Sequence, residues 1–304
     1  MNIIEVDSLV QDYGHGRGVF DISFSIEKGE VFGFLGPNGA GKSTTIRHLM
    51  GFSRPQKGSV KVFGKESFSC YDQILENLGY LPGEIALPDG LNGWEFIEMM
   101  CDLRKIHNKE RLRFLLDKFQ LDPSIDTKLM SLGDKRKLAI VAAFVSDPDV
   151  LVLDEPTSGL DPVMQQVFVD FVKEEKQRGK TILLSSHIFS EVEATCDRIA
   201  IIKDGKIVSQ VYTNDIKRNQ NKVYQITFKQ EKDYNKFLAL SPFGIAEKDM
   251  DNYTVQVKLH DSEIDGLINI ISQVNVVKFK QIKSTLEKHF MKFYKDDKNF
   301  GGQL

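Results

Sequence analysis

Apolar and polar side chains alternate with a period of two near the start of the chain. Over residues 20–26 the apolar positions fall on one side, which predicts an antiparallel strand with one buried face. After a turn at 28–30 the pattern becomes denser. The elements predicted next are a strand over 31–35, a glycine-rich loop over 36–42, a helix over 43–50 and a strand over 60–63.

The middle of the chain has the periodicity of helices. Trp94, Ile97 and Cys101 lie three or four residues apart, as do the apolar residues of 112–119. A third helix is predicted over 137–145, ending before an Asp-Pro pair. These segments predict a helical block over about 91–146.

Short, continuous apolar runs then alternate with helices. Residues 150–153 are all apolar, which is typical of a strand buried on both faces of a parallel sheet. The same region predicts a helix over 163–178 and strands over 181–184 and 199–202. Strands that alternate with helices indicate an α/β fold.

A polar stretch at 213–222 carries no apolar pattern and predicts a domain boundary. Beyond it we expect strand, helix, two strands, helix and strand, the order of a ferredoxin-like α+β domain, with a final helix around 286–294. The chain has 304 residues, which also favours two domains. We predict them over 1–215 and 222–304.

Composition narrows the classes of function. The formal net charge is −3, which argues against a protein that chiefly neutralises nucleic-acid phosphates. The three cysteines are widely spaced, and we expect small buried residues in a reducing compartment. Neither a signal peptide nor an apolar run of about 18 residues is visible, so we expect a soluble, cytosolic chain.

A glycine-rich loop carries the strongest chemical signal. It matches the pattern GxxxxGK[ST], in which backbone N–H groups and a helix N-terminus cradle phosphate oxygens. Lys42 would bring its charge to the β- and γ-phosphates, and the Ser43 hydroxyl would ligate Mg²⁺. The loop and its continuation are Gly36, Pro37, Asn38, Gly39, Ala40, Gly41, Lys42, Ser43 and Thr44.

Two carboxylates follow the apolar strand over 150–153. Because ligands bind at the carboxyl ends of parallel strands, Asp154 is placed to hold Mg²⁺ and Glu155 to orient or deprotonate an attacking water. Alone, such a pair would read as an N-capping pair before a helix. His187 follows the strand over 181–184, where a contact to the γ-phosphate is expected.

With these residues in place, the chain resembles the nucleotide-binding subunit of an ABC transporter over about residues 1–215. Several motifs occur in the family's order. They are Tyr13 at the adenine-stacking position, the Walker A loop, a signature segment at 131–135, Asp154 and Glu155 as Walker B, a D-loop at 158–161 that includes Asp161, and His187 as the switch histidine.

The resemblance implies a P-loop ATPase with an antiparallel β subdomain and a helical subdomain. In that family two ATP-binding domains close head to tail over ATP and Mg²⁺. Ser131 and Gly133 would then contact the γ-phosphate bound to the opposing chain, and Asp161 would belong to the nucleotide site. The implied partners are a second ATP-binding subunit and transmembrane permease subunits, with no nucleic acid.

Two departures from the family pattern stand out. Leu132 replaces the first glycine of the signature, and Asp134 replaces its glutamine. In the Q-loop, Gly83 takes the place of the glutamine and is followed by Glu84. Both features resemble the branch of bacitracin- and lantibiotic-type resistance exporters.

We therefore expect an ATPase on the inner face of the cell membrane that powers the export of an antibiotic, peptide or lipid. The alternatives are a soluble ABC-type ATPase that acts on nucleic acid or ribosomes, and a P-loop kinase. Segment 222–304 resembles the accessory domain of the exporter branch. The surface of the helical block would receive a helix of the membrane subunit, and Trp94 lies either there or in the core.

Overall fold

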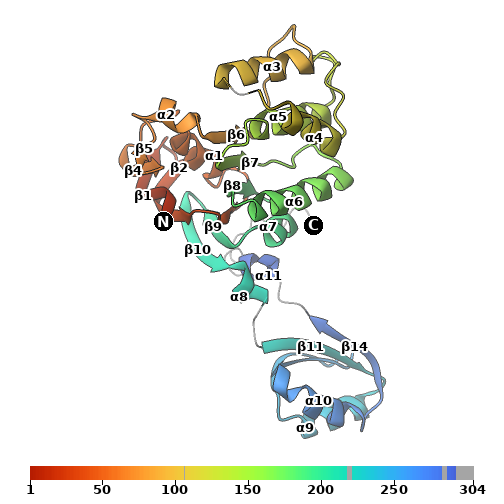
Figure 1. Ribbon diagram of the computed structural model, residues 1–304. Coiled ribbons are helices and arrows are strands. Elements are labelled where there is room, and N and C mark those ends of the chain that lie inside the picture. The colour runs from red at the N-terminus through yellow and green to blue at the C-terminus, as the bar shows by residue number, and fades with distance from the viewer. Residues whose placement is uncertain (106, 218–220, 283–285, 292–304) are drawn as a thin grey trace. The chain divides into compact units, whose positions relative to one another are not determined.

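The computed structural model describes residues 1–105, 107–217, 221–282 and 286–291. It divides into two compact units, Met1–Thr213 and Asn214–Leu304 (Figure 1). The division falls at the start of the polar stretch over 213–222.

The N-terminal unit begins with a four-stranded antiparallel sheet in the order β2-β1-β4-β5. Val6 of the first strand pairs with Phe24 on one side and with Val60 on the other, so apolar side chains line one face. The strands are β1 (Asn2–Asp12), β2 (Gly18–Glu27), β4 (Lys57–Val62) and β5 (Lys65–Glu66).

A six-stranded sheet in the order β10-β9-β3-β8-β7-β6 forms the centre of the unit. All pairings are parallel except that of β10 with β9. Its strands are β3 (Val31–Leu35), β6 (Leu78–Leu81), β7 (Val150–Asp154), β8 (Thr181–Ser186), β9 (Arg198–Lys203) and β10 (Lys206–Tyr212). The sequence predicted the four inner strands but neither edge strand.

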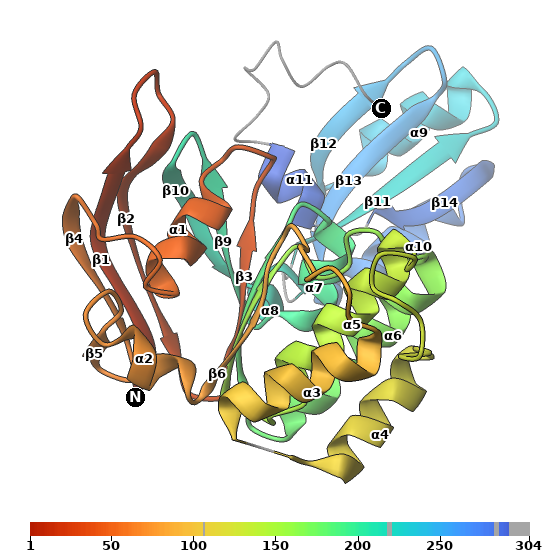
Figure 2. The ribbon, with the colours of Figure 1, turned by 90° about the horizontal axis from the view of Figure 1, so that it is seen from above.

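The elements of this unit pack in layers (Figure 2). Helix α1 (Lys42–Leu49) lies between the two sheets, and Phe24 of the first sheet stacks on Phe32 of the second with ring centroids 5.1 Å apart. The opposite face of the second sheet is covered by helices. They are α5 (Leu132–Phe144), α6 (Pro162–Gln177) and α7 (Phe189–Thr195).

The helical block contains α3 (Gly93–Arg104), α4 (Lys109–Phe119) and α5. The predicted start of the third helix at 137 is wrong. Ser131 caps this helix by accepting a hydrogen bond from the Asp134 N–H, and its polar first turn has no apolar period. Trp94 is 47% exposed, which excludes the alternative that this side chain lies in the core.

The C-terminal unit has an antiparallel sheet in the order β12-β13-β11-β14. Its elements follow in the order strand, helix, two strands, helix, strand. They are β11 (Asn221–Phe228), α9 (Glu231–Leu240), β12 (Gly244–Asp249), β13 (Thr254–His260), a short 3₁₀ turn (Asp261–Glu263), α10 (Ile264–Ile271) and β14 (Val276–Ile282). One apolar cluster, which includes Ile226, Phe237 and Val257, forms its core.

Three short helices complete the description: α2 (Tyr71–Leu75), α8 (Thr213–Lys217) and α11 (Leu286–Met291). The predicted last helix extends beyond 291, outside the described residues. Cys101 and Cys196 are buried as expected, whereas Cys70 is only partly buried. Within the described residues, no helix has the length and apolar character needed to cross a membrane.

Candidate functional site

A cleft of about 750 Å³ opens at the carboxyl ends of the central strands. Strand β3 leads into the glycine-rich loop, and the residues after β7 and β8 meet it there. A second wall comes from the segment after β6. The cleft is lined by Asn38, Ser43, Arg47, Phe52, Tyr80, Pro82, Gly83, Glu84, Asp154, Glu155, Ser158 and His187.

At its last glycine, the glycine-rich loop has a backbone conformation and surroundings that only glycine fits. Gly41 has φ of +110° and caps helix α1, and a Cβ there would lie 2.8 Å from Val19 Cγ1. Gly36 is also enclosed, because a Cβ there would meet the Ile202 carbonyl at 2.5 Å. Asn38 and Gly39, in contrast, are exposed to solvent.

Lys42 lies directly after this loop and is nearly buried. Its Nζ donates hydrogen bonds to the carbonyls of Gly36 at 2.7 Å and Pro37 at 3.1 Å. The same atom pairs with Glu155 Oε1 at 3.1 Å. The side chain therefore bridges the loop and the carboxylate that follows β7, where a phosphate group would compete for it.

Glu155 is held from three sides. Its φ of +49° is uncommon for a residue other than glycine, and its N–H donates to the Ser185 carbonyl at 3.1 Å. Its Oε2 lies 2.6 Å from Nδ1 of His187, whose ring is half exposed. Lys42 and His187, both predicted to contact phosphate, thus meet on one carboxylate.

Asp154 is buried at the end of β7. The Ser185 hydroxyl donates a hydrogen bond to its Oδ1. A Cβ at Gly83 would lie 3.2 Å from its Oδ2, so the segment after β6 packs closely on this carboxylate. Burial, assisted by the charge of Asp154, raises the pKa of Tyr80 to about 12, which keeps that phenol neutral.

Outside the glycine-rich loop, four predicted site residues do not line this cleft. Tyr13 is 54% exposed and follows β1. Ser131 and Gly133 sit at the start of α5, where the Ser131 hydroxyl donates to Asp134 at 2.7 Å. Asp161 caps α6 by accepting hydrogen bonds from the Val163 and Met164 N–H groups.

Sequence reasoning missed two buried ionisable side chains beside the cleft. Arg136 donates to main-chain carbonyls on two of the loops that line it. Glu191 accepts a hydrogen bond from the Ser186 hydroxyl at 2.5 Å, and burial raises its pKa to about 7. No motif or spacing in the sequence marks either residue for a role at the cleft.

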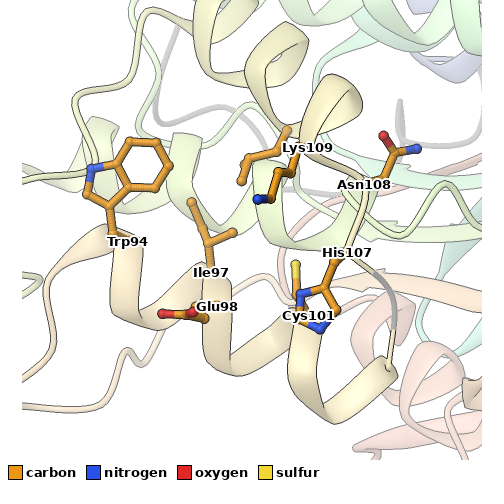
Figure 3. Close-up of a pocket in the computed structure, with 8 residues that line it drawn as sticks. Trp94, Ile97, Glu98, Cys101, His107, Asn108 and Lys109 are labelled. Carbon is orange, nitrogen blue, oxygen red and sulfur yellow. The ribbon is translucent and has the colours of Figure 1, made fainter.

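A smaller cavity of about 230 Å³ lies between α3 and α4 (Figure 3). Trp94, Ile97 and Cys101 follow one face of α3, and Lys109 at the start of α4 extends toward them (Figure 3). It shares no lining residue with the large cleft.

Comparisons with known proteins agree with this arrangement. Residues 19–158 match the family described as ABC transporter. The ABC transporter ATP-binding protein YhcH of Bacillus subtilis is 31% identical, covering 95% of each chain. The bacitracin transport ATP-binding protein BcrA of Bacillus licheniformis is 31% identical, covering 95% of this chain and 96% of its own. A solved ATP-binding subunit of an ABC transporter superposes with a TM-score of 0.66 at 30% identity, covering 71% of this chain and 92% of that one.

Proposed function

This chain belongs to the ATP-binding proteins of ABC transporters, a family of ATPases, and on that premise we propose that it powers export through separate transmembrane subunits. The observation that carries the proposal is the convergence of Asp154, Glu155 and His187 in one cleft, where Lys42 of the glycine-rich loop pairs with Glu155. The similarity to a bacitracin transport protein supports an antibiotic, peptide or lipid as cargo.

The predicted site residues at the cleft each have a chemical role in this proposal. Lys42 and the N–H groups of 36–44 bind the β- and γ-phosphates of ATP. Glu155 accepts a proton from the attacking water or orients it, and His187 fixes the Glu155 carboxylate through its 2.6 Å contact. Because Lys42 pairs with Glu155 at 3.1 Å, bound phosphate would free this carboxylate for the water.

The same cleft has donors that suit Mg²⁺. Ser43 and Asp154 both line it and offer a hydroxyl and a carboxylate oxygen, the hard ligands that this cation prefers. We propose them as its ligands; the cation would neutralise charge on the phosphates. The Ser185 hydrogen bond to Asp154 holds this carboxylate in place.

We propose a head-to-tail pair of ATP-binding chains. Ser131 is exposed and Gly133 is half-buried, and neither belongs to the lining of the cleft. In a pair of chains they would contact the nucleotide of the opposing chain, with Asp161 near the interface. Tyr13 is exposed in a manner that suits stacking on adenine.

A membrane partner would dock on the helical block and the segment after β6. Glu84 lies exposed at the rim of the cleft, and Trp94 is half exposed at the start of α3. A docking surface that contains both residues would move with the cleft and transmit this rigid-body movement to the membrane partner. This proposal places the chain on the inner face of the membrane. We propose residues 222–304 as an accessory domain.

The first test is ATP hydrolysis by the purified full chain. In Lys42→Ala the charge on the phosphates is lost, so hydrolysis should fall to background. The matched control is Lys180→Ala, since Lys180 is also buried and also bonds a carbonyl and a carboxylate, those of Asp147. A Lys42→Ala protein with the parental rate would refute the site.

The second test concerns the partner. The tagged full chain, purified from detergent-solubilised membranes, should carry along a polypeptide with several apolar spans of about 20 residues. Co-purification with ribosomal RNA and without such a polypeptide would instead favour the ribosome-acting alternative.

A further inference from the structure

We infer that Arg136 is a positioning residue for hydrolysis, which fixes two loops of the nucleotide cleft around Glu155 without contacting nucleotide itself. The inference rests on the proposed function and adds a residue to it. Arg136 lies in the second turn of α5 and is 3% exposed. It is absent from the lining of the cleft.

The guanidinium group makes three hydrogen bonds, all to main-chain carbonyls. Its Nε donates to Ser158 at 2.9 Å, one terminal nitrogen to Pro82 at 2.9 Å, and the other to Gly83 at 2.7 Å. A planar fork with fixed donor directions can bridge several acceptors at once. One side chain therefore joins the segment after β6 to the turn after β7.

Both of these segments touch the reacting groups. A Cβ at Gly83 would lie 3.2 Å from Asp154 Oδ2, so Gly83 already packs against this carboxylate. The Ser158 N–H donates to the Glu155 carbonyl at 3.1 Å, which closes a turn directly after Glu155. Arg136 thus supports the walls on either side of the two acids.

The turn after β7, which includes Glu155 and Ser158, has a backbone conformation that requires stabilising contacts. Glu155 has φ of +49°, a conformation that persists only where surrounding contacts fix it. The Ser158 carbonyl is the acceptor on the far side of this turn. Loss of the Arg136 bond would let the turn relax and would move the Glu155 carboxylate relative to the phosphate loop.

The test compares Arg136→Met with the parental chain. Phosphate binding depends on the loop over 36–44, so KM for ATP should stay within about twofold. A displaced general base should lower kcat by at least about tenfold, which corresponds to about 1.4 kcal/mol. Amide hydrogen exchange at Ser158 should become faster in the variant, a readout that does not depend on turnover.

Arg104 provides a matched control. It is half-buried, and it donates to the Leu78 carbonyl at 3.0 Å and to the Ser146 hydroxyl at 3.1 Å. Leu78 begins strand β6, whereas Pro82 follows the end of the same strand. Arg104→Met should therefore lower the free energy of unfolding without lowering kcat or changing exchange at Ser158.

A conservative variant separates the effect of the directed donors of Arg136 from the effect of its charge. In Arg136→Lys one ammonium group replaces three directed donors, so kcat should recover only partly. Equal kcat losses in Arg136→Met and Arg104→Met would reduce Arg136 to a structural residue and overturn the inference. So would a parental kcat in Arg136→Met. The proposed function would survive either result, because only parental hydrolysis in Lys42→Ala refutes the site.

Discussion

The ion pair between Lys42 and Glu155 leads to a prediction with opposite effects on binding and on hydrolysis. In the structure Glu155 Oε1 forms an ion pair with Lys42 Nζ, and the two atoms lie 3.1 Å apart. A phosphate group that binds the loop must displace the Glu155 carboxylate from Lys42. Glu155→Gln keeps the shape of the side chain but removes the competing negative charge, so ATP should bind more tightly while hydrolysis is lost.

The expected magnitudes follow from burial and chemistry. The side chains of Lys42 and Glu155 are 5% and 17% exposed, so solvent screens this pair less than a surface pair. Hydrogen bonds to charged groups contribute about 1.5–3 kcal/mol, and glutamine retains part of this as a neutral acceptor. We expect ATP affinity to rise about tenfold, or about 1.4 kcal/mol. Loss of the general base should lower kcat by at least about a hundredfold.

The assay measures equilibrium binding of a fluorescent ATP analogue and steady-state hydrolysis on the same preparations. The control is Glu30→Gln. Glu30 pairs with Arg198 at 2.8 Å and its side chain is 12% exposed, which resembles the setting of Glu155. This control should leave affinity and kcat unchanged.

The result that refutes the reasoning is weaker ATP binding by Glu155→Gln than by the parental chain. It would mean that the carboxylate does not compete with phosphate for Lys42. Uncleaved ATP should also hold two copies of this variant together, so size-exclusion chromatography should show an ATP-dependent dimer. A variant that stays monomeric with ATP, in the presence of any second ATP-binding subunit, counts against the paired arrangement.

Two further predictions concern stability and coupling. Burial raises the pKa of Glu191 from 4.5 to about 7, so the folded state binds a proton that the unfolded chain releases between these values. The free energy of unfolding should therefore fall by roughly 3 kcal/mol as pH rises from about 4.5 to 7. Urea unfolding at pH 5 and pH 8 should show this fall in the parental chain but not in Glu191→Gln; equal falls would contradict it. Glu84→Lys should uncouple export from hydrolysis while the isolated chain still binds ATP, as judged from the ATPase rate of the assembled complex and resistance in cells; full export would contradict the coupling role.

The inner strands of the central sheet were predictable because they are apolar throughout. Strand β7 shows four apolar residues in a row, a pattern typical of a strand buried on both faces. Strand β10 is an edge strand in which intermediate and exposed positions alternate, so its residues carry no strong apolar signal. Strand β6 includes Gly79, where a Cβ would meet the Ala143 carbonyl at 2.4 Å, and glycine weakens the strand pattern.

Motif spacing located Lys42, Asp154 and Glu155 because each is a neighbour of a strand end or a glycine loop. Arg136 had no such context, since its partners are main-chain carbonyls 22 to 54 residues away. Every residue type has a main-chain carbonyl, so a hydrogen bond to one cannot be predicted from the residue types in the sequence. Contacts of this kind become visible only once the fold brings the segments together.

The two departures from the family pattern meet in one packing unit. A Cβ at Gly159 would lie 2.9 Å from Leu132 Cγ, so the leucine in the signature lies over a position without a side chain. Gly83 likewise has no side chain where Asp154 leaves little space, and its carbonyl is bonded by Arg136. Since Arg136 also bonds Ser158, the residue before Gly159, the altered signature and the altered Q-loop are joined through one guanidinium group. This geometry favours a rearranged but complete cleft over one that has lost a functional part.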